Sequence, residues 1–444
     1  MLKTLLSPLL LSFVLIAPQA TAAPAGTPVK LPSWSQQIAI RESWLAKRHE
    51  MILPMMRRHN IDMWVVVNEE FHNDPLTEYI APPRVYTGNR DIFVFIDTGS
   101  SLRKVAITGY AEENVKRFFE SEDDPKPADQ QLAALYEQYH PKRIGLSIDS
   151  RRGVQRSLTR DSYQFLAKSM GGDAESHFVS SADLIEEYSD TRLPEEFETY
   201  KILVALTDQI TRRAFSNEVI HPGKTTVGDV RRWLYDAMGN AGVTTWFQQD
   251  IRVQRKGSMN GMSRGFLGVA PESTVIEPGD VLHVDFGITA MGFSTDWQKM
   301  AYVLRPGEKD APAGLKHAMA NTNVLQEELM TASRPGKLAG DVYNEILAAM
   351  AKRGIEAKVY SHPIGFQGHG LGAALDYRAT LRGTSEGKPL RKGSYISIEL
   401  NTLTAVPEWD GQKVFVMMED DAYLTDEGFK TFLPRQTSYY LIRP

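Results

Sequence analysis

Four acidic residues interrupt apolar stretches of the sequence that are typical of buried β-strands. They are Asp285, Asp296, Glu399 and Glu419. An ionised carboxylate inside an apolar strand costs several kcal/mol unless a partner compensates its charge. Each of the four acids therefore needs a compensating partner, and one shared positive partner would require their strands to converge, which limits the folds that the chain can adopt.

Spacing divides the four acids into two pairs. Asp285 and Asp296 flank the turn-like segment Ala290–Gly292, so a hairpin would place both carboxylates on one face of a sheet. Glu399 and Glu419 lie on two further apolar runs. The alternative is that each acid pairs with a lysine or caps a loop.

A single histidine, His369, lies between the two pairs in the glycine-rich segment Gly368–Gly372. The flanking glycines allow the backbone to approach another group closely. Two divalent ions would balance four carboxylates, and an oxygen-rich set with one imidazole suits manganese, cobalt, iron or zinc rather than copper. We expect two divalent metal ions per chain, with manganese as the first choice.

In this order and spacing, the five residues resemble the metal-ligand pattern of the pita-bread metallohydrolase family. That family includes methionine aminopeptidase, aminopeptidase P, prolidase and the metal-free creatinase. The resemblance covers about residues 195–435, and the additional N-terminal domain is similar in plan to that of aminopeptidase P, prolidase and creatinase. It implies five metal ligands: Asp285, Asp296, His369, Glu399 and Glu419.

The resemblance also implies a function. We expect a metal-dependent exopeptidase, either an Xaa-Pro-type aminopeptidase or a prolidase-like dipeptidase, that acts on short peptides through a hydroxide bridging the two ions. Glu399 would be the catalytic proton acceptor. Relatives with the N-terminal domain imply a homodimer or higher homo-oligomer. The alternative is a non-catalytic or non-peptide-hydrolysing metal-binding protein of the same fold.

Three positions depart from the family pattern. Family peptidases carry a second histidine seven residues after the ligand histidine, where this chain has Asp376, and another about seventeen residues before the first aspartate, where Gly268 falls. The prolidase branch often has an arginine where Met417 stands. His362, beside a proline, is a candidate catalytic residue that could compensate in part, and a packed loop histidine is the alternative. Asp376 is a candidate catalytic residue that would bind a substrate amine.

The first half of the chain predicts an α/β domain with a layered sheet. Short apolar runs alternate with polar or helical stretches such as Glu112–Glu120 and Gln130–Tyr139. The runs are Met63–Val67, Ile92–Ile96, Val105–Thr108 and Ile144–Ile148. A turn, a proline and acids typical of a helix start follow near residue 190. We expect an N-terminal domain over 23–190 and a pita-bread domain over 191–444.

The second half has two helices followed by two strands, twice over. The predicted helices span 195–216, 226–240, 315–331 and 339–353. The predicted strands span 281–288, 293–303, 394–401 and 413–419. This repetition predicts an α+β domain whose two halves are related by a pseudo-twofold axis around one antiparallel sheet.

The N-terminus has the order of a secretory signal peptide over residues 1–22. Lys3 precedes the apolar run Leu5–Ala17, and Ala20-Thr21-Ala22 offers a cleavage site. The run is shorter than a membrane span requires. We expect a bacterial periplasmic or secreted protein with no membrane association after cleavage. A chain without cysteine cannot use thiol catalysis or disulfides, and its net charge of −5 gives no reason to bind nucleic acid.

Two other enzyme classes have partial motifs. Gly261–Gly265 matches the nucleophile elbow of serine hydrolases, but the residues that follow are poor helix formers. Gly368–Ala373 nearly matches a dinucleotide fingerprint, but no acid-ended second strand follows. Neither motif has the context that its chemistry requires.

Overall fold

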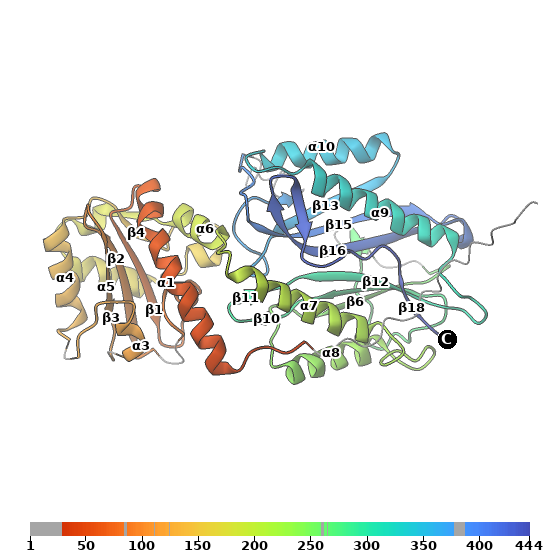
Figure 1. Ribbon diagram of the computed structural model, residues 1–444, viewed down its shortest axis with the longest axis horizontal. Coiled ribbons are helices and arrows are strands. Elements are labelled where there is room, and N and C mark those ends of the chain that lie inside the picture. The colour runs from red at the N-terminus through yellow and green to blue at the C-terminus, as the bar shows by residue number, and fades with distance from the viewer. Residues whose placement is uncertain are drawn as a thin grey trace, which may run out of the picture.

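The computed structural model describes residues 29–83, 87–110, 112–123, 125–258, 262–263, 265–376 and 387–444, with 262–263 described as backbone. The predicted signal peptide over 1–22 lies outside the described residues. The chain forms two domains side by side, one around a five-stranded sheet and one around a nine-stranded sheet (Figure 1). The described helices lack an apolar stretch of the length that a bilayer crossing requires.

The N-terminal sheet has the strand order β3-β2-β1-β4-β5. Its strands are β1 (Met63–Glu69), β2 (Arg90–Asp97), β3 (Leu102–Ile107), β4 (Ile144–Leu146) and β5 (Phe178–Ser180). The first three form an antiparallel meander, and β4 and β5 continue the sheet in parallel with β1. The four predicted apolar runs all become strands, because both faces of the sheet are covered and leave no polar side.

Helices cover both faces of this sheet. They are α1 (Trp34–Arg58), α2 (Thr77–Ile80), α3 (Glu113–Lys116), α4 (Ala128–Tyr139), α5 (Arg160–Met170) and α6 (Ala182–Asp190). Residues of α1 and α6 pack on one face, and residues of α4 and α5 pack on the other. The polar or helical stretch Glu112–Glu120 is helical only over α3, because the backbone of Glu120 pairs with β3 at Lys104 and Ala106.

The C-terminal sheet has the order β14-β13-β15-β16-β12-β9-β6, with β17 paired to β16 and β18 paired to β12. The long strands are β6 (Asp250–Gln254), β9 (Val281–Phe286), β12 (Trp297–Val303), β13 (Glu356–Pro363), β15 (Tyr395–Ala405) and β16 (Lys413–Thr425). The short strands are β14 (Leu375–Asp376), β17 (Gly428–Thr431) and β18 (Tyr440–Ile442). Two small hairpins lie outside this sheet: β7 (Met262–Ser263) with β8 (Phe266–Leu267), and β10 (Thr289–Ala290) with β11 (Phe293–Ser294).

The nine-stranded sheet is built from two similar halves. One half runs α7 (Glu196–Ala214), α8 (Val227–Ala241), β6, β9 and β12, and the other runs α9 (Ala313–Ala332), α10 (Ala339–Lys352), β13, β15 and β16. Strands β12 and β16 pair at the centre, and Figure 1 shows one helix pair along each half. The prediction of two helices and two strands in each half is confirmed, although each half has a third strand that we did not predict.

The predicted strand over 293–303 was wrong as a single element. Residues 293–294 form β11 (Phe293–Ser294), which pairs with β10 (Thr289–Ala290), and β12 begins only at Trp297. The interruption contains Thr295 and Asp296. It lets the tight β10–β11 turn, with a positive φ at Met291 and Gly292, connect to the sheet.

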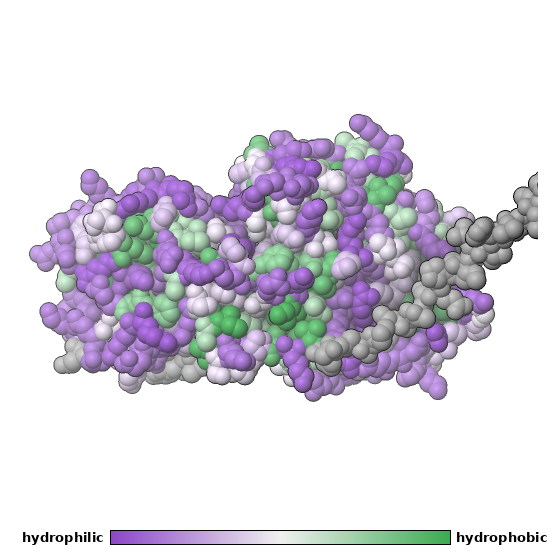
Figure 2. Space-filling model, viewed as in Figure 1, coloured by the Kyte–Doolittle hydropathy of each residue, from purple (hydrophilic) through white to green (hydrophobic). Residues whose placement is uncertain are grey.

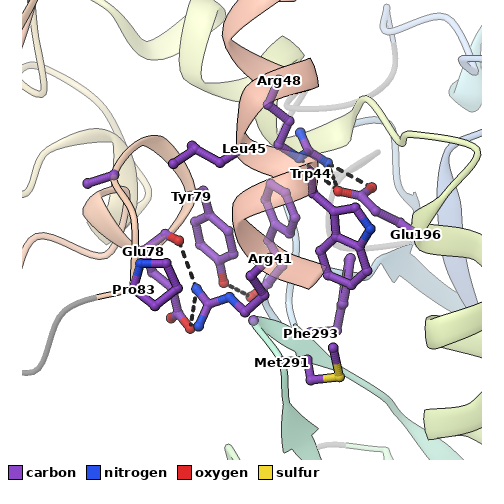
Figure 3. Close-up of a pocket in the computed structure, with 13 residues that line it drawn as sticks. Arg41, Trp44, Leu45, Arg48, Glu78, Tyr79, Pro83, Glu196, Met291 and Phe293 are labelled. Atoms are coloured by element: carbon purple, nitrogen blue, oxygen red, sulfur yellow. Dashed lines mark hydrogen bonds and ion pairs between the residues drawn. The ribbon is translucent and has the colours of Figure 1, made fainter. Parts of the chain in front are cut away.

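The two domains are joined by a buried ion pair. The Arg48 guanidinium on α1 donates two hydrogen bonds of 2.8 Å to the Glu196 carboxylate on α7, and both side chains are buried. Nearby, the Tyr79 hydroxyl (Figure 3) donates to the backbone oxygen of Phe366, and the two rings stack with their centroids 3.9 Å apart. Apolar residues gather over this junction on the face shown in Figure 2. These contacts tie α1 to the first helix of the C-terminal domain, and α2 to a loop of that domain.

Replacing Glu196 by Gln should destabilise the protein by roughly 3–5 kcal/mol, because it leaves the Arg48 charge buried without compensation. Urea unfolding of the purified chain measures the change. Glu195→Gln is a matched control, since Glu195 makes an exposed ion pair with Lys47 between the same two helical segments. Equal effects of the two substitutions would contradict the assignment.

Candidate metal centre

Strand register aligns a row of polar residues across the middle of the nine-stranded sheet. Glu399, Glu419, Gln298, Asp285 and Asp250 are successive partners on β15, β16, β12, β9 and β6. Directly paired residues of antiparallel strands point to the same face. Their chain neighbours on these strands pack against the helices, so the row lies on the face opposite the helices.

Asp296 and His362 join this row from its edge. Asp296 precedes β12, and His362 on β13 is the register partner of Ser397, two residues from Glu399. The His362 Nε2 atom lies 3.5 Å from Asp296 Oδ2, 3.7 Å from Glu399 Oε2 and 3.7 Å from Glu419 Oε1. Bonds of about 2.0–2.2 Å to one ion put tetrahedral ligand atoms about 3.3–3.6 Å apart. The observed separations are close to these values, and the ligand atoms of Asp296, His362 and Glu419 form one group that could hold a metal.

The buried carboxylates are strongly perturbed. Burial raises the pKa of Asp285 to about 7, to which the charge of Asp250 adds, while Arg252 opposes the shift. Burial, and then the neighbouring acids, raise the pKa values of Asp296 and Glu419 well above their ordinary range. In the described part of the chain, the buried atoms Asp285 Oδ1 and Glu419 Oε2 have no hydrogen-bond partner. This donor set fits divalent cations, which would compensate the charges and use the unpaired oxygens.

Lys299, a buried lysine on β12, does not neutralise the row. The Lys299 ammonium is buried and donates to Asp420 Oδ1 at 2.7 Å and to the backbone oxygen of Glu419 at 2.6 Å. Asp420 points to the helix side of β16, where Gln326 also donates to it. Lys299 therefore anchors the strand that carries Glu419.

Three polar neighbours of the site were missed in the sequence. Gln298 and Asp250 belong to the row, and Asp421 accepts hydrogen bonds from the Asp296 backbone and the Tyr200 hydroxyl. Burial raises the pKa of Asp421 well above its ordinary value. Asp421 follows Glu419 at the two-residue period of a strand, so the sequence did contain a signal for it. No comparable pattern marks Gln298.

The glycine-flanked histidine lies next to the row rather than within it. The His369 ring contacts the His362 ring edge-on at 4.6 Å and the Trp246 ring at 5.0 Å, and His369 is exposed. A Cβ atom on Gly368 would lie 2.0 Å from the Trp246 ring, so this position requires glycine. The structure thus brings four predicted ligands together with His362 and places His369 one ring further out.

Asp376, the third predicted catalytic residue, lies at the edge of the same sheet. It is buried on β14 and pairs with Tyr360, which is two residues before His362 on β13. Residues two apart on a strand share a face, so Asp376, Tyr360 and His362 face the same side. This places the carboxylate beyond His362 at the edge of the row.

The nucleophile-elbow motif has the wrong structural context. Met262–Ser263 forms β7, which pairs with β8 (Phe266–Leu267) in an antiparallel hairpin. A serine nucleophile of that type requires a helix directly after the turn. The structure therefore gives no support to a serine hydrolase.

Comparisons with known proteins agree with this geometry. A model of metallopeptidase family M24 matches residues 198–426, which is more than half of the chain. An X-Pro aminopeptidase from Thermotoga maritima MSB8 has a similar structure, with a TM-score of 0.63, 16% identity and coverage of 88% of this chain and 100% of that one. An Xaa-Pro dipeptidase from Bacillus anthracis is also similar, with a TM-score of 0.62, 19% identity and coverage of 90% and 100%. No curated protein matches the chain.

Metal-free protein should lose stability as the pH rises from about 4 to about 7. The folded state holds a proton on Asp285 up to a pKa of about 7, whereas the unfolded chain releases it near 4, so folding binds protons in this window. Urea unfolding in the presence of a chelator measures how the free energy of unfolding depends on pH, and Asp285→Asn should weaken this dependence. Added manganese should restore stability at neutral pH, because the ion binds the folded state. An identical pH dependence for the wild type and Asp285→Asn would contradict the assignment.

Proposed function

This chain belongs to metallopeptidase family M24, and on that premise we propose that it is a dinuclear metal-dependent exopeptidase that hydrolyses short peptides, with Xaa-Pro substrates as the first class to test. The observation that carries the proposal is the convergence of four acids and one imidazole on the sheet face opposite the helices. A scaffold without metal has no physical reason to bury so many carboxylates together.

We assign the imidazole ligand to His362 and a substrate-facing role to His369, which exchanges the roles implied by the sequence resemblance. The Nε2 atom of His362 lies within 3.7 Å of carboxylate oxygens of three acids. His369 follows His362 by seven residues, which is the spacing that family peptidases show between the ligand histidine and their second histidine. If His362 is the ligand histidine, the second family histidine falls at His369, and Asp376 no longer stands where the family has a histidine.

The proposed ligands are Asp285, Asp296, His362, Glu399 and Glu419. When bound, divalent ions supply Lewis acidity, which lowers the pKa of water and stabilises negative charge on oxygen. Glu399 is the least buried of the three acids that lie within 3.7 Å of His362, and it would accept the proton from water. His369 is exposed beside the site and can donate a hydrogen bond to a substrate carbonyl oxygen.

Two departures remain and favour a second candidate, a metal-binding protein of this fold that does not hydrolyse peptides. Gly268 and Met417 replace a histidine and an arginine of the peptidase pattern. Met417 instead belongs to a small apolar cluster with Leu267 and Phe415. The Arg252 guanidinium lies against this cluster, 2.7 Å from the Leu267 backbone oxygen and 3.9 Å from the Met417 sulfur.

Manganese as the ion, export to the periplasm or medium, and assembly into a homodimer or higher homo-oligomer remain part of the proposal. Export rests on the charged and apolar order of residues 1–22, which the structure does not describe. Manganese rests on the oxygen-rich ligand set.

Purified protein supplied with manganese should bind about two ions per chain by elemental analysis. Glu419→Ala should lose most of both ions, because Glu419 faces both Asp296 and the row that contains Asp285, whereas Asp285→Ala should lose less. Asp426→Ala is the control, since Asp426 is an exposed acid beyond the same strand. A wild-type protein without stoichiometric metal would refute the proposed function.

Separate substitutions distinguish the two histidines. His362→Ala should lower metal content, whereas His369→Ala should retain metal and reduce kcat by about 10²–10⁴-fold, the range for loss of a general acid or base. Elemental analysis and kinetics on the same samples give both readouts. The reverse pattern would restore His369 as the ligand.

A panel of dipeptides and tripeptides tests the substrate class and Asp376 together. Short Xaa-Pro peptides should be cleaved and folded proteins should not. If the Asp376 carboxylate binds the substrate amine, Asp376→Asn should lower kcat/KM for free-amine peptides about 10–100-fold, the loss of one charged hydrogen bond. N-acetylated peptides should be insensitive to the substitution, and metal content should be unchanged. Equal kcat/KM values for the wild type and Asp376→Asn on free-amine peptides would assign Asp376 a structural role.

A further inference from the structure

One amide side chain connects two of the acids across the centre of the site. Gln298 is buried on β12, and its Nε2 atom lies 2.6 Å from Glu399 Oε1 and 3.4 Å from Asp285 Oδ2. Asp285 belongs to the first half of the domain and Glu399 to the second. The Gln298 amide therefore holds one carboxylate of each half.

A histidine on the neighbouring strand fixes the orientation of this amide. The His283 Nε2 atom lies 2.9 Å from Gln298 Oε1, and His283 is completely buried. Because an amide oxygen can only accept, His283 Nε2 must carry the proton and donate it. The other ring nitrogen, Nδ1, has no hydrogen-bond partner among the described residues, and this fits an unprotonated nitrogen better than a buried N–H donor.

The opposite orientation of the amide is excluded by charge. With Nε2 and Oε1 exchanged, the amide oxygen would face the oxygens of two carboxylates, which repel it when both acids are ionised as metal ligands. The chain of donors from His283 to Gln298 to Glu399 and Asp285 is thus defined by the chemistry of its members.

We propose that Gln298 is a positioning residue that holds Glu399 and Asp285 in their metal-binding orientation, and that His283 acts through Gln298. This inference rests on the proposed function, because it treats both acids as metal ligands. Partners that orient metal ligands in this way change metal affinity or activity by about 10–100-fold when removed. A residue that only fills space would not have this effect when a side chain of similar volume replaces it.

Calorimetric titration of metal-free full-length protein with manganese tests the inference. Gln298→Met keeps the volume and removes the donor, so manganese affinity should fall about 10–100-fold. His283→Leu should give a similar loss, and His283→Gln, which keeps an N–H donor, should restore much of the affinity. His283 acts only through Gln298. The double variant Gln298→Met/His283→Leu should therefore bind manganese no more weakly than the single variant with the lower affinity.

Kinetics at saturating manganese supply a second readout, in which kcat of Gln298→Met should fall with KM unchanged. Gln326→Met is a matched control, because Gln326 is a buried glutamine that donates to Asp420 on the helix side of β16. It should leave manganese affinity at the wild-type value. If Gln298→Met binds manganese as tightly as the wild type, or if the losses add in the double variant, the inference is overturned and the proposed function still stands. Wild-type protein that binds no manganese would overturn the proposed function as well.

Discussion

The structure depends on how a group of buried negative charges is accommodated on one face of a sheet. Asp285, Asp296 and Glu419 all have raised pKa values because they are removed from water and lie close together. Without a cation, the folded chain can hold them only by retaining protons. The free energy of folding and the affinity for metal are therefore linked, and each affects the other through the same carboxylates.

The alternation of side chains along a strand makes this arrangement possible. On β16, Met418 and Asp420 point to the helices while Glu419 and Asp421 point to the site. The helix side can therefore be packed as an ordinary apolar core, in which Lys299 of β12 and Gln326 of α9 both donate to Asp420. Pairing of the two halves through β12 and β16 then brings carboxylates that are distant in sequence into one row.

Much of the fold and of the site could be predicted from the sequence, for physical reasons that also explain the failures. Apolar strands with single acids were recognisable, so four carboxylates of the site were found. Strand β6 was missed because Asp250 and Arg252 face the site and make the segment look polar. The sequence did not decide which histidine matches the ligand histidine of the family, because His362 and His369 both stand near glycines. The choice depends on their distances from the carboxylates. Gln298 could not be found, because a glutamine on a strand carries no pattern until its partners are known.

The N-terminal domain also contributes to the site, through the loop that connects the two histidines. Phe366 in this loop is stacked by Tyr79, and the Arg48 guanidinium lies 4.2 Å from its ring centre. The Arg192 side chain donates to the backbone oxygen of Ile364 at 3.0 Å. The loop therefore takes its conformation from residues of both domains and of the segment between them. A change at the buried Arg48–Glu196 pair would reach His369 through Phe366, so the domain interface is physically part of the environment of the site.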